Sequence, residues 1–261
     1  KSILKGYKAV LAFSFCALIF FISFLFPVLQ MLYWTIIFPK HLADLNLIEL
    51  FFNTTILVFL SSIVLISFAF ISNYGNRLSK SKFLEILTTF SISGYAMPGI
   101  ILAVAFITFI SWFDNNIVAY FKLETIKSIF IGSIIGLVVV YFIRFYSLAS
   151  NGIKSGYLKI SYSIDESAYL LGYSKFKTFK DIHIPYLKNS ILLIGILIAI
   201  EIIKELPITL IMRPFNFETF ATQAYIYASQ DLLEAAAAPS LFLILIASFF
   251  ILITSRYILK D

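Results

Sequence analysis

Three ionisable residues, Glu201, Lys204 and Glu205, interrupt an otherwise apolar run at about residues 189–212. Charged groups inside such a run are costly to bury, so they mark either a function or a partner. Their spacing of three and four positions would place them on one face of a helix. Two interpretations follow: a polar lining or gate of a translocation path, or a self-neutralising pair within a helix bundle.

Few other side chains could carry out a reaction. The two histidines, His41 and His183, are not at metal-ligand spacing, and Cys16 is the single cysteine. The sequence has no Gly-x4-Gly-Lys-Ser/Thr phosphate loop and no evident pair of nucleophile and base. We therefore expect a chain that is not an enzyme, binds no ATP itself, and holds no metal or cofactor.

The composition is that of an integral membrane protein. Of the 261 residues, 61% are hydrophobic and only 13% are charged, whereas soluble domains carry about 25% charged residues. Disorder and a disulfide scaffold are excluded, because disorder needs low hydrophobicity and Cys16 has no partner. The long apolar runs do not alternate, so helices rather than barrel strands are expected. The net charge of +6 fits cytoplasmic loops better than nucleic-acid binding.

Six membrane-spanning helices are predicted. They cover approximately residues 10–38, 51–73, 86–112, 127–148, 188–212 and 236–257. With both termini placed in the cytoplasm, fifteen of the twenty Lys and Arg residues fall inside. Lys40, Lys122, Lys127 and Arg213 fall outside, and Lys204 lies within a span. This asymmetry follows the positive-inside rule.

Small residues and prolines within these spans suggest packing faces and kinks. Gly132 and Gly136 form a small-xxx-small pattern that is typical of close helix packing. Pro27 and Pro98 fall inside predicted spans, where proline kinks a helix. The kinks are interpreted either as static bends or as hinges.

The longest predicted internal loop, residues 149–187, resembles an amphipathic elbow of two short helices. Asp165 or Ser163 would cap the first helix, and Gly172 would form the turn. Pro185 marks the entry to the next span. Such an elbow could lie on lipid head groups or dock into a cleft of a cytoplasmic partner.

This loop also carries a spaced motif. It consists of Glu166-Ser167-Ala168, then Gly172 after three residues, then Ile182-His183-Ile184-Pro185 after nine more. The pattern resembles the Glu-Ala-Ala…Gly…Ile-x-Leu-Pro signature of permease subunits of binding-protein-dependent ABC importers. Ser167 replaces an alanine and Ile184 a leucine, but the spacing is kept.

The resemblance extends over about residues 50–255 and is strongest to the ferric-iron permeases. Asn53-Thr54-Thr55, Tyr95-Ala-Met-Pro98-Gly99 and residues 205–222 are similar to segments of that subgroup. Its members commonly fuse two six-span halves in one chain. Because this sequence starts at Lys1, it resembles a C-terminal half. Permeases for thiamine, polyamine, sulfate and molybdate share the architecture.

The resemblance implies a type I ABC importer permease fold, with an N-terminal helix and outer loop at 1–48 and a five-helix core at 49–258. It places the ATPase-coupling residues in the elbow: Asp165, Glu166, Ser167, Ala168, Gly172, Ile182 and Pro185. Together with the charged cluster, it gives pathway or gate candidates: Glu201, Lys204, Glu205, Pro207, Arg213 and Pro98.

The implied setting is a bacterial inner membrane. The expected partners are cytoplasmic subunits that bind ATP and Mg²⁺, a second permease half (fused or separate), an extracytoplasmic solute-binding protein and lipid. Ferric iron is the expected cargo. Two other functions stay open: a membrane enzyme with Glu201, Lys204 and Glu205 as a proton relay, and a scaffold whose basic loop binds anionic lipid.

Overall fold

The structure is a computed structural model that describes residues 5–79, 81–121 and 130–258. Every regular element in these ranges is helical, as predicted. Six of the helices are long and apolar enough to cross a membrane. Lys1, Lys80, Lys122, Lys127 and Lys260, which entered the charge count, lie outside the described residues.

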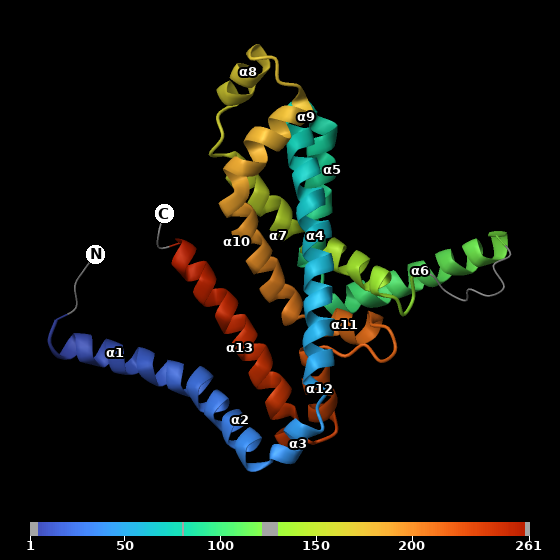
Figure 1. Cartoon of the computed structure of the whole chain (residues 1–261). Coiled ribbons are helices and arrows are strands. Elements are labelled where there is room, and N and C mark those ends of the chain that lie inside the picture. The colour runs from blue at the N-terminus through green and yellow to red at the C-terminus, as the bar shows by residue number, and fades with distance from the viewer. Residues whose placement is uncertain (1–4, 80, 122–129, 259–261) are drawn as a thin grey trace.

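The helices follow one another along the chain as a bundle with two projecting arms, α1 and α6 (Figure 1). Their bounds are α1 Tyr7–Phe20, α2 Phe26–Ile37, α3 Pro39–Ala43, α4 Leu47–Ser79, α5 Lys82–Ile92, α6 Gly99–Phe121, α7 Ile134–Tyr157, α8 Tyr162–Leu170, α9 Lys175–Thr178, α10 Ile184–Ile203, α11 Pro207–Met212, α12 Phe220–Ser229 and α13 Leu233–Ile258. Short π turns at Phe21–Leu25 and Phe179–His183, and a 3₁₀ turn at Ser93–Ala96, connect some of them.

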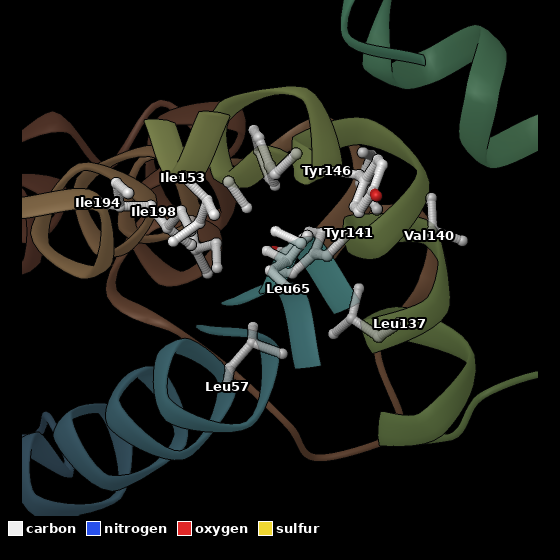
Figure 2. Packing of buried hydrophobic residues seen from close by; sticks show 14 of the residues in the cluster. Leu57, Leu65, Leu137, Val140, Tyr141, Tyr146, Ile153, Ile194 and Ile198 are labelled. Atoms are coloured by element: carbon white, nitrogen blue, oxygen red, sulfur yellow. The ribbon is translucent and has the colours of Figure 1, made fainter. Parts of the chain in front are cut away.

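The core is formed by α4, α7 and α10. Figure 2 shows Leu65 of α4, Tyr141 of α7 and Ile198 of α10 gathered in one cluster, and none of the three has exposed surface. Glycine permits the close approach of α7 and α10, because a Cβ at Gly152 would lie only 2.5 Å from Ile194 Cγ1. The helices α4, α7 and α10 therefore form one packed unit below the elbow.

The third span is broken, contrary to the predicted continuous helix at 86–112. Helix α5 ends at Ile92, a 3₁₀ turn follows, and α6 begins at Gly99. Pro98 disfavours helical backbone at Met97, which is extended at φ −81° and ψ 135°. Pro98 therefore separates the 3₁₀ turn from α6 rather than kinking a single helix.

The fourth span also differs in its limits. Ser133 caps α7, so Gly132 lies outside the helix with φ 65°, and Gly136 abuts the carbonyl of Phe130. The predicted Gly132–Gly136 packing face does not form. At its other end α7 extends to Tyr157, which leaves Arg144 near the middle of the helix instead of at the cytoplasmic edge.

The fifth span is displaced toward the elbow. A continuous helical stretch runs over Lys175–Ile203, so α9, expected as the second short helix of the elbow, is the first turn of this span. The span ends at Ile203, and Pro207 starts the separate helix α11. Only residues 158–161 and 171–174 of the predicted loop 149–187 are outside helices.

Candidate functional site

The elbow projects α8 beyond the end of the bundle (Figure 1). Ser161, rather than the predicted Asp165 or Ser163, caps the helix, since its side chain accepts a hydrogen bond from the amide of Ser163. On its outer surface α8 exposes Glu166 and Ser167. Leu170 and Leu171 continue this surface and are 89% and 79% exposed. A polar and apolar surface of this kind is suited to docking a protein.

Gly172 ends α8 with a Schellman motif. The amide of Tyr173 donates to the carbonyl of Ala168 (3.0 Å), and the amide of Gly172 donates to that of Tyr169 (3.0 Å). Gly172 has φ 82°, a conformation that favours glycine. Ala168 is 3% exposed, so it packs inside the elbow and leaves the outer surface to Glu166 and its neighbours.

Asp165 faces inward and joins a buried network that the sequence did not reveal. Its Oδ2 accepts from Arg77 Nε of α4 at 2.6 Å, and its Oδ1 lies 2.7 Å from His183 Nε2. His183 has no exposed surface and its Nδ1 lies 3.3 Å from the hydroxyl of Tyr157. His183 is thus a partner in this network rather than an isolated histidine. Two motif residues flank it, half-buried Ile182 and exposed Pro185.

The charged cluster of the fifth span divides into two parts. Glu201 and Lys204 form the predicted i, i+3 pair, with 2.7 Å between Oε1 and Nζ, and the Lys204 side chain is 54% exposed. Because α10 ends at Ile203, Glu205 does not extend that face. It turns toward α7, where its Oε2 lies 3.4 Å from Arg144 Nε.

Arg144 and Glu205 connect the two helix breaks. Arg144 Nη1 donates to the carbonyl of Met97 in the break before α6 (2.8 Å), and Glu205 Oε1 accepts from the amide of Ile208 at the start of α11 (3.3 Å). We call this group the break node. Gly99 leaves it room, because a Cβ there would lie 2.8 Å from Glu205 Oε1. Pro98 and Pro207, both predicted pathway residues, flank the node.

Tyr141 and Thr209 extend the break node by a buried hydroxyl contact between α7 and α11. Thr209 also donates to the carbonyl of Glu205 at 2.6 Å. These bonds satisfy backbone groups that the interrupted helices leave unpaired, which a membrane interior requires. The node therefore links the two broken spans to each other.

Arg213 lies apart from the node, in the loop before α12. It pairs with Glu218, and Thr222 donates to the other carboxylate oxygen of Glu218 at 2.8 Å. Asn53 of α4 donates to the carbonyl of Glu218 at 3.0 Å, and Thr54 accepts from the amide of Phe220 at 3.3 Å. The Asn-Thr pair at the start of the second span therefore fixes this loop.

Two polar cavities lie at opposite ends of the molecule. One of about 600 Å³ sits beneath the elbow, lined by Asn73, Arg77 and Lys154 among others. The other, of about 460 Å³, is lined by Asp44, Glu49 and Glu218. Among the described residues, no group of three or more His, Cys, Asp or Glu side chains is arranged to hold a metal ion.

No family model matches the chain. A curated protein with a similar sequence is found. The Fe(3+)-transport system permease protein FbpB 2 of Haemophilus influenzae is 20% identical over 256 residues, which are 97% of this chain and 48% of the relative. The chain thus spans about half the length of the curated relative that it matches.

Solved structures with the same fold come from a bacterial ABC transporter that imports the acidic polysaccharide alginate. One covers 95% of this chain and 94% of its own, with a TM-score of 0.73 and 16% identity. A second, in complex with an alginate pentasaccharide-bound periplasmic protein, covers 95% and 93% with a TM-score of 0.74 and 16% identity. The chain has the all-helical membrane fold of ABC importer permeases, and its predicted resemblance to binding-protein-dependent permeases, including a ferric-iron one, is confirmed.

Proposed function

We propose that the chain is a permease half of an ATP-driven importer in a bacterial inner membrane. It would form one side of the translocation path and would be driven by cytoplasmic ATP-binding subunits, which carry the ATP and Mg²⁺. A second permease half, fused or separate, would complete the path, and an extracytoplasmic binding protein would deliver the cargo. The carrying observation is the elbow: a capped helix on a Schellman turn, exposed at the end of this fold.

The exposed face of α8 supports docking to an ATP-binding subunit. Glu166, Leu170 and Leu171 present a charge beside a small apolar tip, a combination that gives a partner both orientation and buried area. Ser167 lies on the same face, whereas Asp165 and Ala168 stabilise the elbow from inside. Gly172 ends the helix with the positive φ that its Schellman turn needs.

The break node supports a role in gating. Two interrupted helices meet there through Arg144 and Glu205, and short breaks of this type are places where a span can bend at low cost. Glu201 and Lys204 lie beside the node, and Lys204 borders an apolar pocket of about 410 Å³. We propose that these residues line or close the path and that Arg213 orders the loop beyond it.

Ferric iron is the proposed cargo. It is supported by the name of the Haemophilus influenzae relative and by the carboxylates of Asp44 and Glu49 in the cavity opposite the elbow. Acidic side chains at the entrance of a translocation path would attract cations and disfavour sulfate or molybdate. Thiamine and polyamines are the alternative cargoes with a matching charge.

Purification of the full-length polypeptide with the ATP-binding subunit encoded beside it tests the proposal. The ATP-binding subunit should co-purify, and vesicles should take up ferric iron when ATP and the binding protein are present. Leu170→Asp should remove the co-purifying subunit, because it places a charge in the apolar tip of α8.

Phe215→Asp is the matched control. Phe215 is also a large exposed apolar residue, at 100% exposure, but it lies at the opposite end of the molecule. It should leave co-purification unchanged. Absence of an associated ATPase with the unmodified chain, or uptake independent of ATP, would refute the proposed function. Uptake of another solute in place of iron would refute only the cargo.

A further inference from the structure

The second span, α4, contacts both arms of the elbow. Arg77, near the end of α4, donates from Nη1 to the carbonyl of Ile160 (3.0 Å) and from Nη2 to that of Ser161 (2.9 Å), besides its bond to Asp165. Its side chain is only 6% exposed. One guanidinium group thus binds the linker between α7 and α8 and the first half of α8.

The return arm of the elbow is held by the same helix. The hydroxyl of Tyr74, one turn before Arg77, donates to the carbonyl of Lys175 at 2.6 Å. The Tyr74 ring also meets the rings of Phe179 and His183, with centroids 4.9 and 5.2 Å apart. His183 then closes the loop by its contact with Asp165.

The chain segments that join α8 to its neighbours are turns rather than continuous helix. Residues 158–161 join α8 to α7, residues 171–174 join it to α9, and neither segment is helical. Neither linker gives α8 a continuous helical connection to α7 or α10, so the side-chain contacts add to what fixes its orientation. Buried charge-assisted hydrogen bonds are shorter and stronger than neutral ones and hold a fixed geometry.

We propose that Arg77, Asp165 and His183 are positioning residues that make α4 move as one body with the elbow. This inference rests on the proposed function, in which an ATP-binding subunit displaces α8. The displacement would enter the spans through α4 and, by the contact of Asp165 with His183, at the start of α10, and would reach α7 through the core around Leu65. Without the network, the exposed face of α8 would still dock to the ATP-binding subunit. Its displacement would then change the linkers and would not be passed on to α4.

The network has features of a positioning device rather than of simple stabilisation. A buried ion pair is often no more stabilising than apolar side chains of the same volume, so its presence is weak evidence for stability. Arg77 fixes the orientation of α8 relative to α4, because its planar guanidinium group reaches three acceptors on two neighbouring segments at once. A lysine carries the same charge but cannot reach all three acceptors together.

Arg77→Gln in the complete transporter, with its ATP-binding subunits and binding protein in nanodiscs and vesicles, tests the inference. The ATP-binding subunits should still co-purify and hydrolyse ATP, because the outer face of α8 is unchanged. Uptake per ATP hydrolysed should fall at least several-fold, because displacement of α8 would no longer be passed on to α4. Arg77→Lys should recover part of this ratio.

Arg256→Gln is the matched control, since Arg256 is exposed near the end of α13 and lies outside the elbow. It removes the same charge and should leave uptake per ATP unchanged. Arg77→Gln with the uptake per ATP of the unmodified protein would overturn the inference. Lack of an associated ATPase or of ATP-dependent uptake in the unmodified protein would instead refute the proposed function.

A second measurement keeps Arg77 in place and decides the matter if Arg77→Gln does not assemble. Spin labels at two exposed positions outside the apolar tip, Ser163 of α8 and Ser79 at the end of α4, report the distance between the elbow and the second span. The distance should be equal in the nucleotide-free and ATP-bound transporter. A change between the two states would show that α8 moves independently of α4, contrary to the inference.

Discussion

At the scale of single residues, two carboxylates of the fifth span that are close in the sequence have different partners. Glu201 and Glu205 are four positions apart, yet Glu201 pairs with Lys204 within the same segment, and Glu205 pairs with Arg144 across the bundle. The cause is local: the helix ends between them, so the side chains point in different directions. Their substitutions should therefore have different consequences.

Glu205→Gln should destabilise the protein far more than Glu201→Gln. The Glu205 side chain is 9% exposed and its partner Arg144 is 21% exposed. Losing one member of a buried pair leaves an uncompensated charge and costs about 3 kcal/mol or more. Lys204, in contrast, keeps over half of its side chain exposed. Thermal unfolding in detergent should show the larger drop in Tm for Glu205→Gln.

The double substitution Glu205→Gln with Arg144→Gln provides the check on this explanation. It removes both charges, so it should be less destabilising than the sum of the two single changes. Equal Tm values for Glu205→Gln and Glu201→Gln would contradict the importance assigned to the break node.

At the scale of elements, two prolines are each preceded by a widened helical turn. Each π turn ends two residues before a proline: Phe21–Leu25 precedes Pro27, and Phe179–His183 precedes Pro185. Because proline has no amide hydrogen and its ring crowds the carbonyl four residues back, the preceding turn widens. In the second case, His183 closes the widened turn in contact with Asp165.

Glycines then decide how closely the helices pack. The two glycines of α7 that permit close packing are Gly152 and Gly156, which face α10. They are not the predicted Gly132 and Gly136. A Cβ at Gly156 would lie 2.7 Å from Leu187 Cδ2, and one at Gly152 would be still closer to Ile194. The close contact between α7 and α10 thus requires glycine, which has no side chain, at both positions.

Gly152→Ala should lower the stability of the protein by about 1–3 kcal/mol, the usual cost of an overpacked core. Gly195→Ala, on the neighbouring α10, is the matched control, because a Cβ there would make an ordinary contact of 3.6 Å with Ile66. It should be neutral or slightly stabilising, since alanine favours helix. Thermal unfolding measures both, and equal effects would contradict close packing at Gly152.

The sequence predicts spans and elbow well because both depend on local signals. Apolar runs report the six spans, and the spacing from Glu166 to Pro185 reports the elbow. The helix breaks at Pro98 and Lys204–Leu206 were less visible, because an apolar run does not show whether its backbone is continuous. The networks of Arg77 and Arg144 could not be predicted, since they join residues that are far apart in the chain and depend on which helices become neighbours.

At the scale of the whole molecule, much apolar surface stays uncovered. Helix α1 contains no buried residue, and α2 packs mainly on α13. A helix that is apolar all round needs lipid or another protein around it. The exposed apolar surface of α1 and α2 therefore fits a chain that is embedded in a bilayer, and its orientation there can be measured.

The positive-inside asymmetry predicts that the elbow faces the cytoplasm and the loop before α12 faces the outside. Because Cys16 is the single cysteine, a Cys16→Ser background permits labelling at one chosen site. Phe215→Cys should react with a membrane-impermeant maleimide in intact spheroplasts. Leu170→Cys should react only after the membrane is permeabilised, because α8 would be on the inner side.

Both chosen positions are strongly exposed in the chain, at 100% for Phe215 and 89% for Leu170. Expression without the ATP-binding subunit keeps α8 uncovered, so a lack of reaction reports the side of the membrane and not burial. Labelling after permeabilisation shows that each cysteine is reactive. The opposite pattern would invert the topology and place the elbow where no ATP-binding subunit can reach it. Since the proposed coupling, the docking face of α8 and the role of Arg77 all need a cytoplasmic elbow, this measurement bears on each of them at once.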